Sequence, residues 1–150
     1  MHTKFATGTG VALLLTASGL VAASPATGAA LPPKTSFTVV TSFVTDPSPI
    51  VAADGPWSDC TTVSNLSNVA NQVSPSKVQF SGEKAVHCAN GDVVIHYDAV
   101  TNFHGAPRTS GTWSVVSSTK PDLVGGAGTV VGEGRGCEDC IVDTFTGRVY

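Results

Sequence analysis

Residues 110–150 read SGTWSVVSSTKPDLVGGAGTVVGEGRGCEDCIVDTFTGRVY, and they decide the fold class of this chain. Three runs rich in Val, Thr and aromatic residues predict three consecutive β-strands, over 111–116, 124–132 and 141–150. A strand at the end of a chain frays unless a neighbouring strand pairs with it. The last run therefore predicts that the sheet closes at the C-terminal strand.

The middle run is unusually rich in glycine. Glycine inside a strand marks a bulge, a sharp bend or the close approach of another group. Small closed barrels need such points where their strands bend around a corner. We therefore favour a barrel strand over a glycine-rich loop for the segment with glycines at 125, 126, 128, 132, 134 and 136.

The preceding chain adds further strands and no clear helix. Alternation of side chains along the chain predicts strands over 37–44 and 93–100. A further strand, over 77–88, places apolar residues on one face, and Lys84 is the exception on that face. Turn residues recur roughly every eight to twelve residues, which is typical of all-β domains. The predicted fold is all-β, a single antiparallel β-barrel of about eight strands, with a β-sandwich as the alternative.

Segment 60–74 fits two structures. Apolar residues at 66, 69, 70 and 73 recur with helical spacing, whereas the β-branched residues at 61–63 fit a strand. We favour a strand, because a hairpin turning at Ser74-Pro75 would place Cys60 directly opposite Cys88, at a separation that a disulfide spans. The same register puts three further residues on one face: Leu66, Ala70 and Phe80.

Residues 1–30 have the pattern of a secretory signal peptide. Lys4 precedes an apolar run over 11–23 that is too short to span a bilayer, and small residues follow it. A short membrane anchor is the alternative. We expect residues 31–150 to form a single secreted, extracellular domain with no membrane attachment in its mature form.

The charge of the chain argues against two classes of partner. Eleven acidic residues stand against eight basic ones, and removal of Lys4 with the leader leaves seven basic residues and a formal charge of −4. Nucleic acids and anionic membranes need clustered Lys and Arg, whereas the charges here are few and scattered. We expect a small apolar ligand or a protein partner instead.

Four cysteines lie in the mature chain, and an exported protein is expected to pair them. Besides Cys60 and Cys88, the loop over 137–140 brackets two acidic residues with Cys137 and Cys140, which predicts a local disulfide. A redox-active pair is the alternative, but the acidic residues would raise the thiol pKa and oppose reactivity. We expect no metal and no cofactor, because the histidines are dispersed and a second paired ligand cluster is missing.

Candidate acid/base residues are few. His96 and Asp98 share one face of the 93–100 strand, where they either form an acid/base pair beside a cavity or face solvent. Asp143 shares its face with the apolar residues Ile141 and Phe145. Such neighbours would raise the pKa of the carboxyl or leave it to bind a polar group of a ligand, with a position at the barrel rim as the alternative.

Five aromatic residues are expected to point into the barrel. Aromatic side chains line an apolar pocket in some small barrels and fill the interior of others. We favour a filled core and keep these residues as the ligand-lining candidates: Phe37, Phe80, Tyr97, Trp113 and Phe145.

The last third of the chain resembles the small secreted relatives of the allene oxide cyclase and dirigent barrels. The matching segments are GTWSVV at 111–116, GGAGTVVGEG at 125–134 and DTFTGRV at 143–149. The chain departs from the family pattern at 117–121, where SSTKP replaces the usual Gly-Thr-Gly turn. The resemblance implies an eight-stranded antiparallel barrel with an apolar cavity, and no family catalytic residue maps onto this chain.

These features predict a secreted, non-catalytic barrel that binds a small apolar ligand or a protein partner. The alternative is a small barrel isomerase or cyclase that uses an inward-facing acid/base residue, with His96, Asp98 and Asp143 as the candidates. Fold alone does not choose between the two, because one barrel architecture supports many functions.

Overall fold

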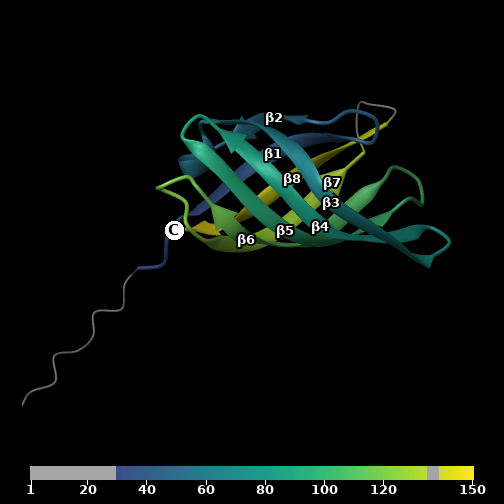
Figure 1. Ribbon diagram of the computed structural model, residues 1–150. Helices are drawn as coiled ribbons and strands as arrows, with labels where there is room; N and C mark the ends of the chain where they lie inside the picture. The colour runs from purple at the N-terminus through teal and green to yellow at the C-terminus, as the bar shows by residue number, and fades with distance from the viewer. Residues whose placement is uncertain (1–29, 135–138) are drawn as a thin grey trace, which may run out of the picture. The chain divides into compact units, whose positions relative to one another are not determined.

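The computed structural model describes residues 30–134 and 139–150, and this part of the chain forms a closed antiparallel β-barrel (Figure 1). Each strand pairs with the next along the chain, and the last pairs with the first. The elements are β1 (Lys34–Ser42), β2 (Ser48–Ala53), the 3-10 turn η1 (Gly55–Trp57), β3 (Cys60–Ser74), β4 (Lys77–Cys88), β5 (Gly91–Asn102), β6 (Arg108–Ser118), β7 (Gly126–Glu133) and β8 (Cys140–Val149).

The closed order confirms the predicted eight-stranded barrel and rules out the sandwich. No helix in the described part is long and apolar enough to cross a membrane. The predicted signal peptide falls almost entirely outside the described residues, which begin at Ala30.

The three C-terminal strands lie where the sequence predicts them, as β6, β7 and β8. β8 pairs with β7 on one side and with β1 on the other, so the end of the chain closes the sheet. The Tyr150 N–H donates to the Gly125 carbonyl at 3.0 Å, which extends this pairing to the last residue. A Cβ on Gly128 would lie 2.0 Å from the Thr146 carbonyl oxygen, so β7 and β8 approach too closely for any side chain there.

Segment 60–74 is strand β3, and a disulfide joins Cys60 to Cys88 on β4, as the hairpin register predicts. Towards the tip, however, the predicted register is wrong, because β3 contains three irregularities and Ser74 pairs with Lys77. The shift brings Ala70 directly opposite Phe80, whereas Leu66 falls at a bulge and is 55% exposed. Figure 1 shows this hairpin extending beyond its neighbours.

One end of the barrel, which we call the closed end, is filled by aromatic side chains. The Phe37 ring stacks on Phe145 at a centroid distance of 4.7 Å and lies at the same distance from Trp57. Trp57 in turn meets Trp113 edge-on at 5.9 Å. All four residues are buried, as are the surrounding apolar side chains Val86, Val93, Ile95, Leu123 and Val149.

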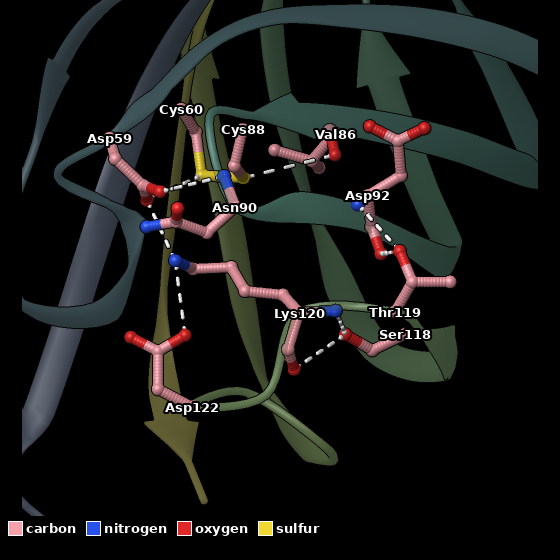
Figure 2. A network of polar contacts seen from close by, with 10 residues as sticks. All are labelled: Asp59, Cys60, Val86, Cys88, Asn90, Asp92, Ser118, Thr119, Lys120 and Asp122. Atoms are coloured by element: carbon pink, nitrogen blue, oxygen red, sulfur yellow. Dashed lines mark hydrogen bonds and ion pairs between the residues drawn. A yellow bond between two sulfur atoms is a disulfide. The ribbon is translucent and has the colours of Figure 1, made fainter.

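At this closed end a buried lysine, Lys120, connects neighbouring loops through ion pairs (Figure 2). Lys120 is 2% exposed, and its Nζ lies 2.8 Å from Asp59 Oδ1 and 3.0 Å from Asp122 Oδ1. The second Asp59 oxygen accepts the Asn90 N–H at 3.3 Å. Burial lowers the pKa of Lys120, but its hydrogen bonds to the two carboxylates outweigh that effect and raise the pKa. The loop that precedes β3 is thereby linked to the β4–β5 turn and to the β6–β7 loop.

Candidate functional site

The opposite end of the barrel, the open end, contains a cavity of about 190 Å³. It lies where β1 leads into β2 and β5 leads into β6, and exposed residues such as Phe43 and Asn68 form its rim. The apolar part of its lining is Phe80, Ala99, Val130, Ile141 and Phe145, and the polar part includes Thr41, Lys84, Tyr97, Thr101, Thr109 and Asp143. The cavity lining therefore combines apolar side chains with hydroxyl, amide and charged groups.

Lys84 provides the basic group of this cavity. The residue is 6% exposed, and its Nζ donates to Asn65 Oδ1 at 2.7 Å and lies 5.0 Å from the centroid of the Tyr97 ring. Among residues 30–134 and 139–150, no carboxylate oxygen lies within 4.0 Å of this nitrogen. Burial lowers the pKa of Lys84, and the charges of Asp143 and Asp46 oppose that shift without cancelling it.

Asp143, on β8, provides the carboxyl group of this cavity. Its Oδ2 accepts the Thr41 hydroxyl hydrogen at 2.7 Å, whereas its Oδ1 is buried and has no hydrogen-bond partner in the described part of the chain. A Cβ on Gly132 would lie 2.0 Å from Oδ1, so this glycine makes room for the carboxyl. Burial raises the pKa of Asp143, although the Thr41 hydrogen bond and the Lys84 charge act against it. The direction is the one expected from its apolar neighbours.

Two further side-chain hydrogen bonds lie among the polar lining residues. Tyr97 donates its phenol hydrogen to Asn68 Oδ1 at 3.0 Å, and Thr101 pairs with Thr109 at 2.9 Å. Burial and the Asp143 charge raise the pKa of Tyr97 to about 12. The phenol is therefore neutral at physiological pH, and the ionisable groups that face the cavity are those of Lys84 and Asp143.

The five predicted ligand-lining aromatics are spread over both ends of the barrel, and Phe145 contacts both, because its ring stacks on Phe37 and also lines the cavity. Phe80, Tyr97 and Phe145 line the cavity. Phe37 and Trp113 do not, because they pack against Trp57 in the closed end. The barrel interior is thus a filled core at one end and a cavity at the other. From the sequence, a filled core and an apolar pocket are predicted as alternatives.

His96 and Asp98 lie on the outside of the barrel. Their side chains are hydrogen-bonded, with His96 Nε2 3.1 Å from Asp98 Oδ2, and are 39% and 50% exposed. The inward face of β5 is instead formed by the buried residues Ile95, Tyr97 and Ala99. The pair faces solvent and does not line the cavity, which is the second of the two alternatives predicted from the sequence.

Lys84 lines the cavity but is not among the site residues predicted from the sequence. It appeared as the one charged residue on the apolar face of the 77–88 strand. Charged side chains are almost never fully buried unless they are paired or serve a function. A lysine at an inward position of a barrel strand was therefore a usable signal for the site.

The remaining cysteine and metal predictions concern other parts of the chain. Cys140 is disulfide-bonded, and its predicted partner Cys137 lies outside the described residues. In the described part, the side chains that bring three potential metal-ligand atoms together are Asp59, Cys60 and Cys88. Two of these atoms are the disulfide sulfurs, which cannot act as thiolate ligands, so this cluster does not form a metal site.

Asp143→Asn is expected to stabilise the barrel at neutral pH and to change little at about pH 3, below the ordinary Asp pKa. Because the folded-state pKa is raised, the folded protein binds this proton more tightly, and stability falls as pH rises from the unfolded to the folded pKa. Asparagine does not titrate and avoids that loss. A gain of about 1 kcal/mol, an ordinary single-site effect, is expected from urea unfolding near pH 7.

Asp98→Asn is the matched control for this experiment. Hydrogen bonds from Ser81 and His96 lower the pKa of Asp98, so its replacement brings no gain at neutral pH. Destabilisation by Asp143→Asn at both pH values would show that the carboxylate is well compensated inside the barrel.

Comparison with known proteins gave no further guide. Scans against protein-family models, curated proteins and solved structures found no match for this chain. The resemblance to the allene oxide cyclase and dirigent barrels stays a prediction from the sequence.

Proposed function

We propose that this protein is an exported, non-catalytic binding barrel that holds one small molecule in the cavity at its open end. This proposal rests on the uneven filling of the barrel interior. Four aromatic rings pack the closed end, whereas about 190 Å³ is left hollow at the other. Protein interiors are ordinarily close-packed, so a cavity confined to one end and reaching the rim is suited to a ligand.

The size and lining of the cavity define the class of ligand. An engineered apolar cavity of roughly 150 Å³ binds benzene, so this cavity has room for one ring or a short chain. Phe80, Ala99 and Ile141 provide apolar contact for the body of such a molecule. A polar group on it would have to pair with Lys84 or Asp143, because an unpaired polar group is costly to bury.

A small isomerase or cyclase is the second candidate function. It is favoured by one observation, the buried carboxyl of Asp143 facing the cavity with a raised pKa. General acids and bases work best with pKa values near the operating pH, and burial moves a carboxyl in that direction. Since His96 and Asp98 lie outside, Asp143 would carry the proton transfer. Asp143→Asn would then abolish turnover while binding persists.

The binding proposal is tested by NMR titration with benzyl alcohol, a one-ring probe with a single hydroxyl. Saturable shifts are expected at the amides of cavity residues such as Phe80, Ala99 and Ile141. Ala99→Leu fills the cavity and is expected to weaken binding by at least about tenfold, a loss of roughly 1.4 kcal/mol. Ala127→Leu, on the exposed face of β7, is the control that should leave binding unchanged.

Equal affinity in the two leucine variants would place the probe elsewhere and contradict the proposal, as would a complete absence of shifts. Native mass spectrometry of the protein purified from its own medium identifies the natural ligand. A stoichiometric extra mass that disappears on denaturation is the expected result.

A further inference from the structure

The two buried lysines of the described chain have opposite surroundings. Lys120 lies at the closed end between Asp59 and Asp122, which hold its ammonium group by ion pairs. Lys84 has no carboxylate within 4.0 Å in the described part, and Asn65 Oδ1 is its one hydrogen-bond acceptor there. A lysine ammonium carries three N–H donors, so Lys84 is poorly compensated as a cation.

The position of Lys84 is also that of a nucleophile rather than of a structural cation. The residue is 6% exposed, and its side chain lines a cavity that reaches the rim of the barrel, where Phe80, Ala99 and Ile141 form part of the wall. An amine in such surroundings gains free-base character, and burial does lower the pKa of Lys84. The neutral amine keeps one N–H on Asn65 Oδ1 and leaves its lone pair available.

A proton donor and acceptor lies on the same cavity. Asp143 is 7% exposed and is held by Thr41, and its raised pKa keeps more of the carboxyl protonated than in water. Lys84 and Asp143 influence each other electrostatically, which places them in one site. A carboxyl of this kind can donate a proton to a developing alkoxide or to a departing hydroxyl.

We propose that Lys84 binds small aldehydes or ketones covalently in this cavity, as an imine on Nζ. The inference rests on the proposed function, because the carbonyl compound must first enter the cavity. It goes beyond that function by naming the reactive atom and the class of ligand. It is distinct from the isomerase alternative, which needs only Asp143.

The chemistry is balanced without a further reactant. The Nζ lone pair adds to the carbonyl carbon, the carbonyl π electrons move to oxygen, and proton transfer from nitrogen to oxygen gives a carbinolamine. The hydroxyl then leaves as water with a proton that Asp143 supplies, and the C=N bond forms. Loss of the last N–H proton returns a proton to Asp143, so aldehyde and amine become imine and one water with no oxidation or reduction.

Reductive trapping tests this proposal. The folded protein is incubated with benzaldehyde and cyanoborohydride, which reduces the imine to a stable benzyl amine. One benzyl group per chain is expected, and peptide mapping should place it on Lys84. Because the cavity holds the aldehyde beside Nζ, labelling there is expected to be at least about tenfold faster than at the exposed residues Lys34 and Lys77.

Three variants sharpen the result. Lys84→Arg keeps a cation and should remove the fast adduct, whereas Lys77→Arg, on an exposed lysine, should leave it in place. Ala99→Leu retains Lys84 but fills the cavity, so it should slow labelling even if Lys84→Arg folds poorly. Circular dichroism of each variant confirms that the barrel is intact.

The possible outcomes distinguish imine formation on Lys84 from the binding function on which it depends. Benzyl alcohol binding without a fast adduct on Lys84 would overturn the imine while leaving the binding barrel in place. Labelling at equal rates on all accessible lysines would do the same. Failure of both benzyl alcohol and benzaldehyde to reach the cavity would overturn both proposals.

Discussion

Replacing Trp57 by alanine is expected to lower the free energy of unfolding by about 3–5 kcal/mol, the range for large aromatic residues in protein cores. Trp57 is fully buried, and its ring lies 4.7 Å from that of Phe37 and 5.9 Å from that of Trp113 between centroids. It is the one buried residue of η1, so no neighbour in that turn can fill the space. Urea unfolding followed by circular dichroism measures the loss.

Phe103→Ala is the control for this change. Phe103 is 40% exposed in the loop between β5 and β6, so its truncation is expected to cost less than about 0.5 kcal/mol. Trp57→Ala should still bind benzyl alcohol, because it alters the closed end and leaves the lining of the cavity unchanged. A loss as small as that of Phe103→Ala would contradict the view that the aromatic end is the packed core of the barrel.

The barrel itself was predictable because its strands are long and their side chains alternate. In β5, buried residues at 93, 95, 97, 99 and 101 alternate with more exposed ones over the whole strand. The same period of two marks β8, which pairs with β1 on one side and with β7 on the other. Regular strands of this kind carry their own signal, independent of the rest of the fold.

The register of the β3–β4 hairpin was not predictable beyond its disulfide. The opposed cysteines fix the register at one position of the hairpin. The simplest prediction for the other positions is a regular pairing without bulges. The hairpin instead has three irregularities, all of which place the extra residue on β3, which has fifteen residues against the twelve of β4. Bulges bend a strand to follow the curvature of a barrel, and that requirement arises from closure and not from local sequence.

The division of the interior into core and cavity was also beyond the sequence. Alternation assigns a residue to the inner face but does not give its level along the barrel axis. Phe37 and Phe80 are both inward aromatics, yet one meets Trp57 in the closed end and the other lines the cavity. Trp57 lies in a 3-10 turn outside any strand pattern, so the residue that fills the closed end gave no periodic signal.

Lys84 and Asp143 break the pattern that the rest of the interior follows. Both are buried with their pKa values shifted towards the neutral forms, and neither is within ion-pair distance of an opposite charge in the described chain. Such groups lower stability, because an unpaired charge is costly to bury. Local departures from good folding rules concentrate at functional sites, which is why we propose a ligand-binding site at this cavity.

Removing the Cys60–Cys88 disulfide by a double alanine substitution is expected to cost about 3.5 kcal/mol. The two cysteines are 28 residues apart in sequence, and the chain-entropy model gives roughly this value for a loop of that length. The bridge also joins β3 to β4 at the closed end, next to the Asp59–Lys120 ion pair (Figure 2). For a domain with a total stability of about 5–15 kcal/mol, the loss is large enough to be read directly from urea midpoints.

Alanine substitution of both Cys137 and Cys140 is the matched control, because it removes the same number of sulfur atoms. The predicted bridge there closes only four residues, for which the same model gives about 2 kcal/mol. Removal of the Cys60–Cys88 bridge, which closes the longer loop, should therefore lower the free energy of unfolding more. Equal losses would contradict the loop-entropy explanation and would mean that the Cys60–Cys88 bridge acts mainly through the contacts that it makes in the folded barrel.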